Sequence, residues 1–297
     1  MPTGIILLDK PQGLTSNRAL QKVRWAYRAR SAGHVGTLDP MATGMLPICL
    51  EEATKVIAEI EAGTKCYEFT VQLGTRTDTG DAEGSVVEQT ALPLLDAARV
   101  EAALDSFRGV QQQVPPMYSA LKRAGQPLYE LARQGIEVER AARTIEIRRL
   151  EVLGLSDGAL ELVCECAKGT YIRVLGEDIA RKLGTVGHLT RLRRAWVTPF
   201  REMPMFTLEA VLAGAEDASG LLAPDVALQA LPYVGLSAMQ AVAIQQGQAV
   251  THGLASVGQR VRLYGPDGTF MGLAEGLPDG RLQPRRLLQQ VQPKPML

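Results

Sequence analysis

The sequence has little of several features that by themselves would indicate a class of protein. It holds four cysteines in 297 residues, with no Cys-x-x-Cys pair, so neither a disulfide scaffold nor a zinc site is expected. No run of eighteen apolar residues exists, which argues against a transmembrane helix. The start, MPTGIILLDKPQG, reaches an acidic residue and a proline too soon for a signal peptide. These absences predict a reduced, cytoplasmic protein without membrane association.

Aromatic residues are also scarce, at 5%, so the core must be mostly aliphatic. Hydrophobic residues make up 46% and charged residues 22%, a composition that supports a sizeable core and excludes a disordered or collagen-like chain. The length fits two ordinary domains, or one large domain with an appendage.

The chain also lacks a net charge, because its 32 basic and 32 acidic residues cancel. A zero sum argues against a nonspecific polyanion binder but says nothing about local patches. Three segments are basic: residues 11–40 with five cations and one acid, residues 168–201, and the C-terminal Arg281, Arg285, Arg286 and Lys294. They indicate either one face for an anionic polymer or ordinary solvated surfaces, and the charge pattern leaves both open.

Periodicity and turn residues predict a mixture of helices and strands. Helices are expected over residues 17–30, 52–61, 94–107, 127–134 and 171–183, with loops over 31–47 and 75–85. Strands are expected over residues 4–8, 65–73, 144–153, 160–167, 261–263, 270–274 and 281–287, with a turn at Ser156, Asp157 and Gly158. The composition changes near Leu231, which predicts a domain boundary between residues 1–230 and a small β-barrel at 231–297.

The loop at 31–47 is the most unusual stretch, because three glycines, His34 and Asp39 lie close together in it. Glycine lets a backbone approach a ligand closely. Asp39 precedes Pro40, so its backbone favours extended or turn geometry, and an acid held there is a candidate nucleophile or base. Alternatively, Asp39 makes an Asx turn and His34 is an ordinary hydrogen-bonded loop residue.

The segment GHVGTLDPMATGMLPICLEEATK at residues 33–55 closely resembles the signature of bacterial tRNA pseudouridine synthases of the TruB type, which modify uridine 55 in the T-loop. Further blocks resemble that family in its order: LDKPQGLTS (8–16), Lys-x-Tyr (65–67), LGTRTDTGDAEG (73–84), QVPPMYSALK (113–122) and KGTYIR (168–173). Val35 stands where the family usually has threonine, and Glu51 replaces a common glycine. The C-terminal segment is a weaker match and resembles a PUA-type RNA-binding domain.

The resemblance implies an α+β protein with the pseudouridine synthase fold, in which helices flank a mixed, largely antiparallel central sheet, followed by a small PUA-like β-barrel. It implies a catalytic domain at 1–230 and an RNA-binding domain at 231–297. An insertion at about 80–144 resembles the RNA-gripping element of the stand-alone bacterial enzymes. The expected partner is therefore the T-stem and T-loop of tRNA, bound by a monomer without guide RNA or partner proteins.

The family's reaction breaks the bond between ribose C1′ and uracil N1, turns the base and rejoins it through C5, with no metal or cofactor. Its single catalytic aspartate corresponds to Asp39, which adds to C6 of uracil or acts at C1′. Arg173 would keep this carboxylate ionised, because a nearby guanidinium favours the charged form. The base must first be flipped out of its stack.

The remaining site residues implied by the resemblance bind the substrate. Tyr67 would stack on the target base and take part in proton removal from C5, and Tyr171 would line the same pocket. Leu192 would supply a backbone contact to the uracil edge. His34 would contact RNA near the flipped nucleotide, without a role in proton transfer.

Two rival functions remain at this point. One is a noncatalytic tRNA-binding or tRNA-folding protein on the same fold, although the presence of Asp39, Tyr67 and Arg173 argues for activity. The other is a different carboxylate enzyme such as a glycoside hydrolase. That chemistry needs a second positioned acid, and the candidate loop offers only Asp39.

Overall fold

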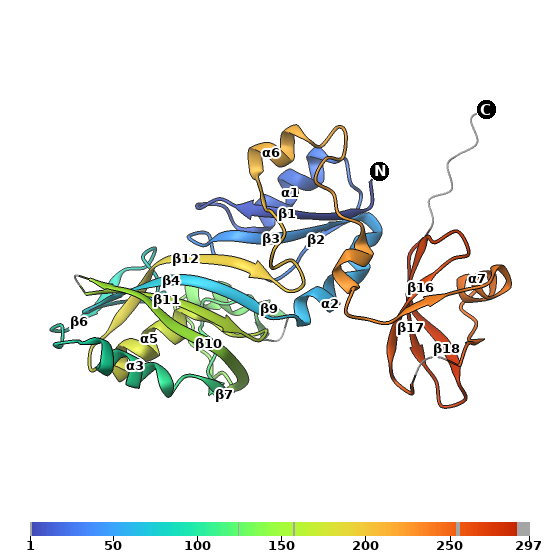
Figure 1. Ribbon diagram of the computed structural model, residues 1–297. Helices are drawn as coiled ribbons and strands as arrows, with labels where there is room; N and C mark the ends of the chain where they lie inside the picture. The colour runs from blue at the N-terminus through green and yellow to red at the C-terminus, as the bar shows by residue number, and fades with distance from the viewer. Residues whose placement is uncertain (1, 124, 157, 254–255, 290–297) are drawn as a thin grey trace.

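A computed structural model describes residues 2–123, 125–156, 158–253 and 256–289, so Asp157 of the expected turn and Lys294 of the third basic segment lie outside it. The chain forms two units, one built on a nine-stranded sheet and one on a five-stranded sheet (Figure 1). Within the described residues, no helix is long and apolar enough to cross a membrane. The prediction of an α+β fold is confirmed.

The large sheet is mixed, with two parallel strand pairs, β1–β13 and β3–β12, among otherwise antiparallel ones. Its order is β13-β1-β3-β12-β4-β11-β10-β7, and β2 pairs with β3. The strands are β1 (Gly4–Lys10), β2 (Ala32–His34), β3 (Thr43–Leu50), β4 (Lys65–Leu73), β7 (Gly109–Gln113), β10 (Arg143–Ser156), β11 (Ala159–Cys166), β12 (Gly187–Val197) and β13 (Phe206–Thr207).

Helices and short elements cover this sheet and connect its strands. The helices are α1 (Ser16–Ala26), α2 (Ile57–Ala62), α3 (Ala97–Asp105), α4 (Leu128–Arg133), α5 (Ile172–Lys182) and α6 (Leu208–Ala213), with 3-10 turns η1 (Glu51–Val56) and η2 (Pro224–Leu228). Two small hairpins pair β5 (Thr75–Thr77) with β6 (Val86–Gln89) and β8 (Lys122–Arg123) with β9 (Gln126–Pro127).

Two separate hydrophobic clusters show how the layers are arranged. Ile6 and Leu8 of β1 belong to the cluster that includes residues of α1, α3, α5 and α6. Ile5 and Leu7 point the other way, into a cluster with residues of η1, α2 and η2. Side chains alternate along a strand, so β1 is buried on both faces, which explains its continuous apolar sequence.

Helix α1 begins where the sequence predicts but ends four residues earlier than expected. The Thr15 hydroxyl oxygen accepts a hydrogen bond from the backbone N–H of Arg18 at 3.1 Å and caps the N-terminus. After Ala26 the chain turns, and Arg28 has a φ of 50°. The Arg24 guanidinium donates to the carbonyls of Ala29 and Arg30, which satisfies backbone groups beyond the helix end.

The prediction of a loop over residues 31–47 is wrong in part, because β2 and the first half of β3 lie in it. Pro47 sits within β3, opposite Leu7, and its carbonyl accepts a hydrogen bond from Val35. Gly44 has a φ of +99°, and a Cβ there would lie 2.2 Å from the carbonyl oxygen of Arg194. Glycine is therefore required where β3 and β12 come together.

The structure explains how Glu51 occupies a position at which the pattern described above usually has glycine. Glu51 has a φ of 51°, the left-handed region in which glycine is the least strained residue. Its carboxylate accepts a hydrogen bond from the backbone N–H of Arg30 at 2.6 Å, and its own N–H donates to Ser31 at 2.8 Å. These two bonds hold a non-glycine residue in this conformation.

The C-terminal unit is a curved five-stranded sheet with one helix, α7 (Ala238–Gln245). Its order is β14-β16-β17-β18-β15, so the described strands form a half-barrel. The strands are β14 (Tyr233–Gly235), β15 (Val250–Thr251), β16 (Arg260–Tyr264), β17 (Phe270–Gly276) and β18 (Arg281–Leu287).

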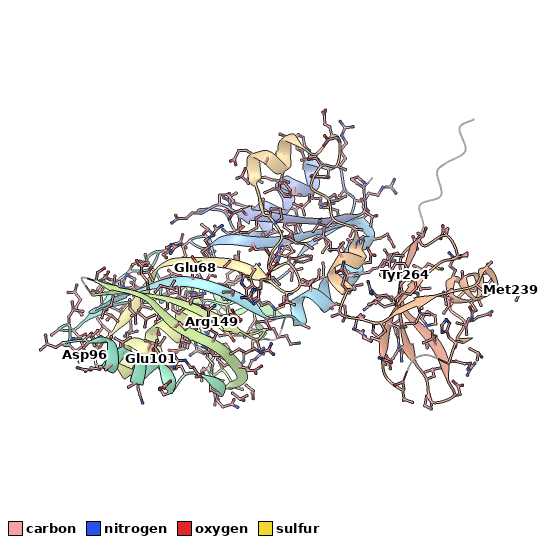
Figure 2. The ribbon with its side chains drawn as sticks, viewed as in Figure 1. Glu68, Asp96, Glu101, Arg149, Met239 and Tyr264 are labelled. Carbon is pink, nitrogen blue, oxygen red and sulfur yellow. The ribbon has the colours of Figure 1, made fainter. Side chains whose placement is uncertain are left out.

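Polar contacts fasten this unit to η1, α2 and η2. Arg260 forms an ion pair with Glu59, and Lys55 Nζ donates to the carbonyl of Leu287 at 2.7 Å. The Tyr264 hydroxyl donates to Asp225 at 2.8 Å. Figure 2 shows Tyr264 at this junction and Met239 on the far side of the C-terminal unit.

Candidate active site

A pocket of about 330 Å³ lies where the loop after β2, strands β4 and β12, and the start of α5 meet. It brings together five of the six residues predicted for the site: Asp39, Tyr67, Tyr171, Arg173 and Leu192. These residues are distant in sequence, so the fold assembles a single cavity from them.

The loop that carries Asp39 is held from two sides by buried polar groups. The Ser16 hydroxyl donates to the carbonyl of Leu38 at 3.0 Å and accepts from its N–H at 2.7 Å. The Lys10 ammonium donates to the carbonyl of Leu14 at 2.6 Å and to that of Pro40, the residue after Asp39, at 3.4 Å, and burial lowers its pKa to about 8. Asp39 is therefore displayed on a fixed backbone.

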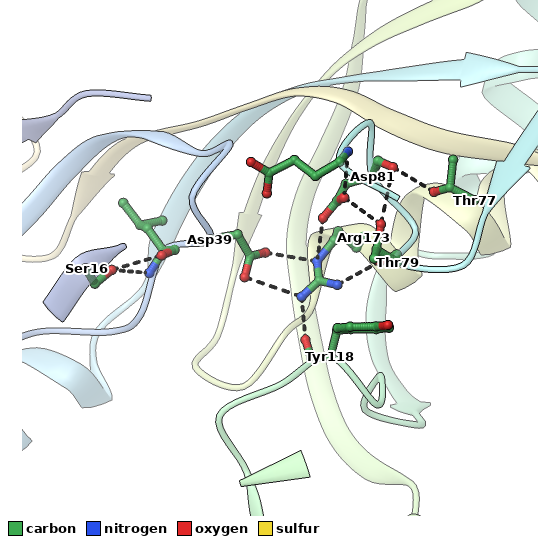
Figure 3. Close-up of polar contacts among 9 residues, drawn as sticks. Ser16, Asp39, Thr77, Thr79, Asp81, Tyr118 and Arg173 are labelled. Carbon is green, nitrogen blue, oxygen red and sulfur yellow. Dashed lines mark hydrogen bonds and ion pairs between the residues drawn. The ribbon is translucent and has the colours of Figure 1, made fainter. Parts of the chain in front are cut away.

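Arg173 binds the Asp39 carboxylate with two nitrogen atoms (Figure 3). Its Nε donates to Oδ2 at 2.9 Å and its Nη2 to Oδ1 at 3.4 Å. The Asp39 side chain keeps 32% of its surface exposed, whereas that of Arg173 is 6% exposed. Among the described residues the carboxylate accepts hydrogen bonds from Arg173 alone, so the Asx-turn interpretation of Asp39 is wrong.

The same guanidinium joins two further segments to the site. Nη1 donates to the carbonyl of Thr79 at 2.7 Å, and Nη2 donates to the carbonyl of Tyr118 at 2.6 Å. Arg173 is the second residue of α5. Its guanidinium donates hydrogen bonds to acceptors on three different loops. A cation at a helix N-terminus opposes the helix dipole, and these acceptors compensate for that.

Asp81 is a second acid near Asp39 that the sequence interpretation did not single out. Its Oδ2 lies 3.7 Å from Arg173 Nε, and its side chain is 6% exposed. Oδ1 accepts hydrogen bonds from the Thr79 hydroxyl at 2.6 Å and the Glu83 backbone at 3.1 Å. It lies in the block TRTDTGDAEG, outside the glycine-rich loop at 31–47.

Arg194 is the largest omission of the sequence interpretation. It is 1% exposed, lines the pocket, and donates to the carbonyls of Met45, Val35 and Gly36. Its two-residue spacing from Leu192 on a strand is the signal that both point inward. The Arg194 guanidinium packs directly against the glycine-rich loop. A Cβ atom added at Gly36 would lie only 2.8 Å from Arg194 Nη1.

Tyr67 faces the pocket from β4, in register with Arg194 on β12. Burial raises the pKa of its phenol, and the Arg194 guanidinium offsets part of this rise. Lys65, two residues earlier on the same strand, also lines the pocket; burial lowers the pKa of its ammonium to about 8. The phenol is therefore protonated at neutral pH.

The expected insertion supplies one wall of the pocket, the segment from Tyr118 to Leu121. Its strand β7 is joined to the start of α5, because the Gln113 side chain accepts from the Tyr171 N–H at 2.8 Å and donates to its carbonyl at 3.1 Å. Burial raises the pKa of the Tyr171 phenol.

His34 is the one predicted site residue that does not line the pocket. It ends β2, and its buried Nδ1 has no hydrogen-bond partner among the residues described. Burial and the Arg194 charge lower the pKa of its imidazole, so the ring is neutral at pH 7.

Comparisons with known proteins cover almost the whole chain. The family model of the TruB family pseudouridylate synthase N-terminal domain matches residues 24–172, and two TruB C-terminal models match residues 173–229 and 232–288. The tRNA pseudouridine synthase B of Aromatoleum aromaticum is 49% identical over 97% of this chain and 93% of its own. That of Chromohalobacter salexigens is 48% identical over 96% and 94%.

The fold also resembles a solved structure, the Cbf5–Nop10–Gar1 complex, with a TM-score of 0.74 and 24% identity over 96% of this chain and 85% of that one. At this identity the likeness concerns the fold alone. The matched family models and the sequence relatives define the protein as a pseudouridine synthase, an isomerase. The chain belongs to the TruB family of pseudouridylate synthases.

Proposed function

We propose that this enzyme converts uridine 55 in the T-loop of tRNA to pseudouridine, with Asp39 as the catalytic residue. The observation that carries the proposal is the Asp39 carboxylate, bound by two nitrogens of Arg173 in a pocket lined by Tyr67 and Tyr171. Relatives that carry the name tRNA pseudouridine synthase B support tRNA as the substrate.

The chemistry needs a carboxylate beside a flipped nucleotide. Asp39 adds to C6 of uracil or acts at C1′ as the bond between C1′ and N1 breaks. The base then turns, C5 bonds to C1′, and the proton on C5 leaves while N1 gains one, so the product is an isomer of the substrate. Flipping the base costs a few kcal/mol, and stacking on Tyr67 returns about 1–3 kcal/mol.

The decisive experiment incubates the purified protein with an unmodified tRNA transcript and maps pseudouridine by carbodiimide chemistry. Conversion of uridine 55, with no guide RNA and no second protein added, is the expected result. A transcript with cytidine at position 55 is the control. Modification at another uridine, or none, would contradict the assignment.

Tyr67→Phe tests whether the phenol hydroxyl takes part in proton removal from C5. The ring and its stacking remain, so we expect turnover to fall by at least about a hundredfold, the scale of a lost proton-transfer group, if the protonated hydroxyl relays the proton. The tRNA affinity should stay within several-fold. Single-turnover kinetics and a binding titration measure the two effects. A fully active variant would leave Tyr67 as a stacking platform only.

We further propose that residues 231–297 hold tRNA outside the T-loop and perform no chemistry. All six residues assigned to the site precede residue 200, whereas β18 carries Arg281, Arg285 and Arg286. Of these, Arg281 and Arg285 form ion pairs with Asp279 and Glu275. In the described part of the chain Arg286 has no acidic partner.

Replacing Arg285 and Arg286 together with alanine should therefore weaken tRNA binding and leave turnover at saturating tRNA intact. The plot of log affinity against log salt should become shallower by roughly one unit per lost phosphate contact. Affinity titrations at several salt concentrations measure this slope. Unchanged affinity and slope would show that these arginines do not contact RNA.

A further inference from the structure

The outward face of α1 combines cations with an exposed aromatic ring. Arg18, Lys22 and Trp25 are spaced by four and three residues, so they lie on one side of the helix, and all three are exposed. We call these three residues the α1 face. Trp25 is 83% exposed, although aromatic residues make up only 5% of the chain. An exposed tryptophan beside two cations is a surface suited to a ligand with both phosphates and flat rings.

The cations of the first basic segment differ from those of the other two in their ion pairing. In the second segment, Arg181, Arg191, Arg193 and Arg201 pair with acids, and in the third Arg281 and Arg285 do so. None of the five cations at residues 11–40 forms an ion pair with any described residue. The positive charge of the α1 face is therefore not neutralised by the protein itself.

The position of α1 connects this charge to the pocket. Ser16 in its first turn bonds Leu38, the residue before Asp39. Helices α1 and α5 contribute to the same hydrophobic cluster, so they lie on the same face of the sheet as the pocket. The α1 face thus starts beside the active-site loop and extends about 10 Å along the helix, at 1.5 Å per residue.

A groove between α1 and the segment after α6 limits where a polyanion can lie. On the side of α1 and the turn after it, the groove is lined by Trp25 and the cations Lys22, Arg24 and Arg28, and on the other side it is lined by Glu216 and Asp217. The acids repel phosphates, so an RNA backbone would follow the α1 rim and not cross the groove.

We propose that the α1 face binds the RNA backbone next to the target nucleotide, with Trp25 stacking on an unpaired base. This proposal rests on the proposed function, because it takes the occupant to be the RNA substrate. Arg18 and Lys22 contact successive phosphates that lead into the pocket.

The test measures binding of an unmodified tRNA transcript in the Asp39→Asn background, so that no RNA is converted. Arg18→Ala with Lys22→Ala should make the plot of log affinity against log salt shallower by roughly two units. Trp25→Ala should weaken binding about tenfold with little change in that slope.

Two controls remove comparable side chains elsewhere on the surface. Arg148→Ala with Arg149→Ala deletes two cations that are already paired with Glu146, Glu151 and Glu165. Leu94→Ala truncates an apolar side chain that is 95% exposed. Both controls should bind like the parent protein. If the α1 variants match their controls, the proposal is overturned, and the α1 face is left to a protein partner.

Failure of the proposed function would show separately, as absence of pseudouridine in the mapping experiment.

Discussion

Replacing Asp39 with asparagine is expected to abolish turnover while leaving tRNA affinity within several-fold. The amide has nearly the shape of the carboxylate but neither its charge nor its nucleophilicity, so the covalent or electrostatic step is lost. Activity should fall below about a hundredth of that of the parent enzyme, the scale of a lost nucleophile. Single-turnover pseudouridine formation and a binding titration measure the two quantities.

A stability measurement separates this effect from misfolding. The amide side chain of the variant still offers one oxygen to Arg173, and the Asp81 carboxylate remains 3.7 Å from the guanidinium, so the unfolding temperature should fall less than in a variant that removes the Arg173 cation. Residual activity above a hundredth, in a variant that folds normally, would exclude Asp39 as the essential residue and make Asp81, the second acid beside Arg173, the candidate instead.

Replacing Arg173 with alanine is expected to remove both activity and a large part of the stability of the catalytic domain. The change leaves Asp39 without a partner, the buried Asp81 without a cation, and the carbonyls of Thr79 and Tyr118 without a donor. Breaking a buried ion pair costs about 3–5 kcal/mol, and the exposed part of Asp39 favours the lower end. Turnover and urea unfolding measure the two losses.

Arg173→Lys separates the charge from the shape of this side chain. Lysine retains the cation but cannot bind the carboxylate and two carbonyls in a fixed fork. It should restore part of the stability and little of the activity. A lysine variant with full activity would mean that the charge alone positions Asp39.

The sequence predicted most of the site because its blocks lie in loops and helix starts with distinctive residues. Asp39 follows from a glycine-rich loop, whereas Arg173 follows from the resemblance of the block KGTYIR to the family. Strand β12 was not predicted, although it lies in the middle of the sheet. Its arginines at 191, 193 and 194 suggest a solvated segment, and only the folded sheet shows that Arg194 is buried beneath the loop.

The rest of the site depends on contacts between segments that are distant in the sequence. The periodicity of hydrophobic residues predicts helices and strands but not such contacts. Asp81 reaches Arg173 because the loop after β5 folds over α5. The three basic segments looked equivalent in sequence, yet their ion pairing differs. Helix α1 ends early at a turn in which Tyr27 is buried at 3% exposure and Arg28 has a φ of 50°, features that helical periodicity does not predict.

The manner in which Arg173 holds the insertion has a consequence for variation among related chains. The guanidinium contacts the Tyr118 carbonyl, a group that every amino acid carries. The side chain at position 118 is thus free to change as far as this contact is concerned. The number of residues between β7 and Tyr118 is not free to change, because one inserted or deleted residue would move the Tyr118 carbonyl away from the Arg173 guanidinium. Substitutions in this wall leave the anchor intact, whereas changes of length remove it.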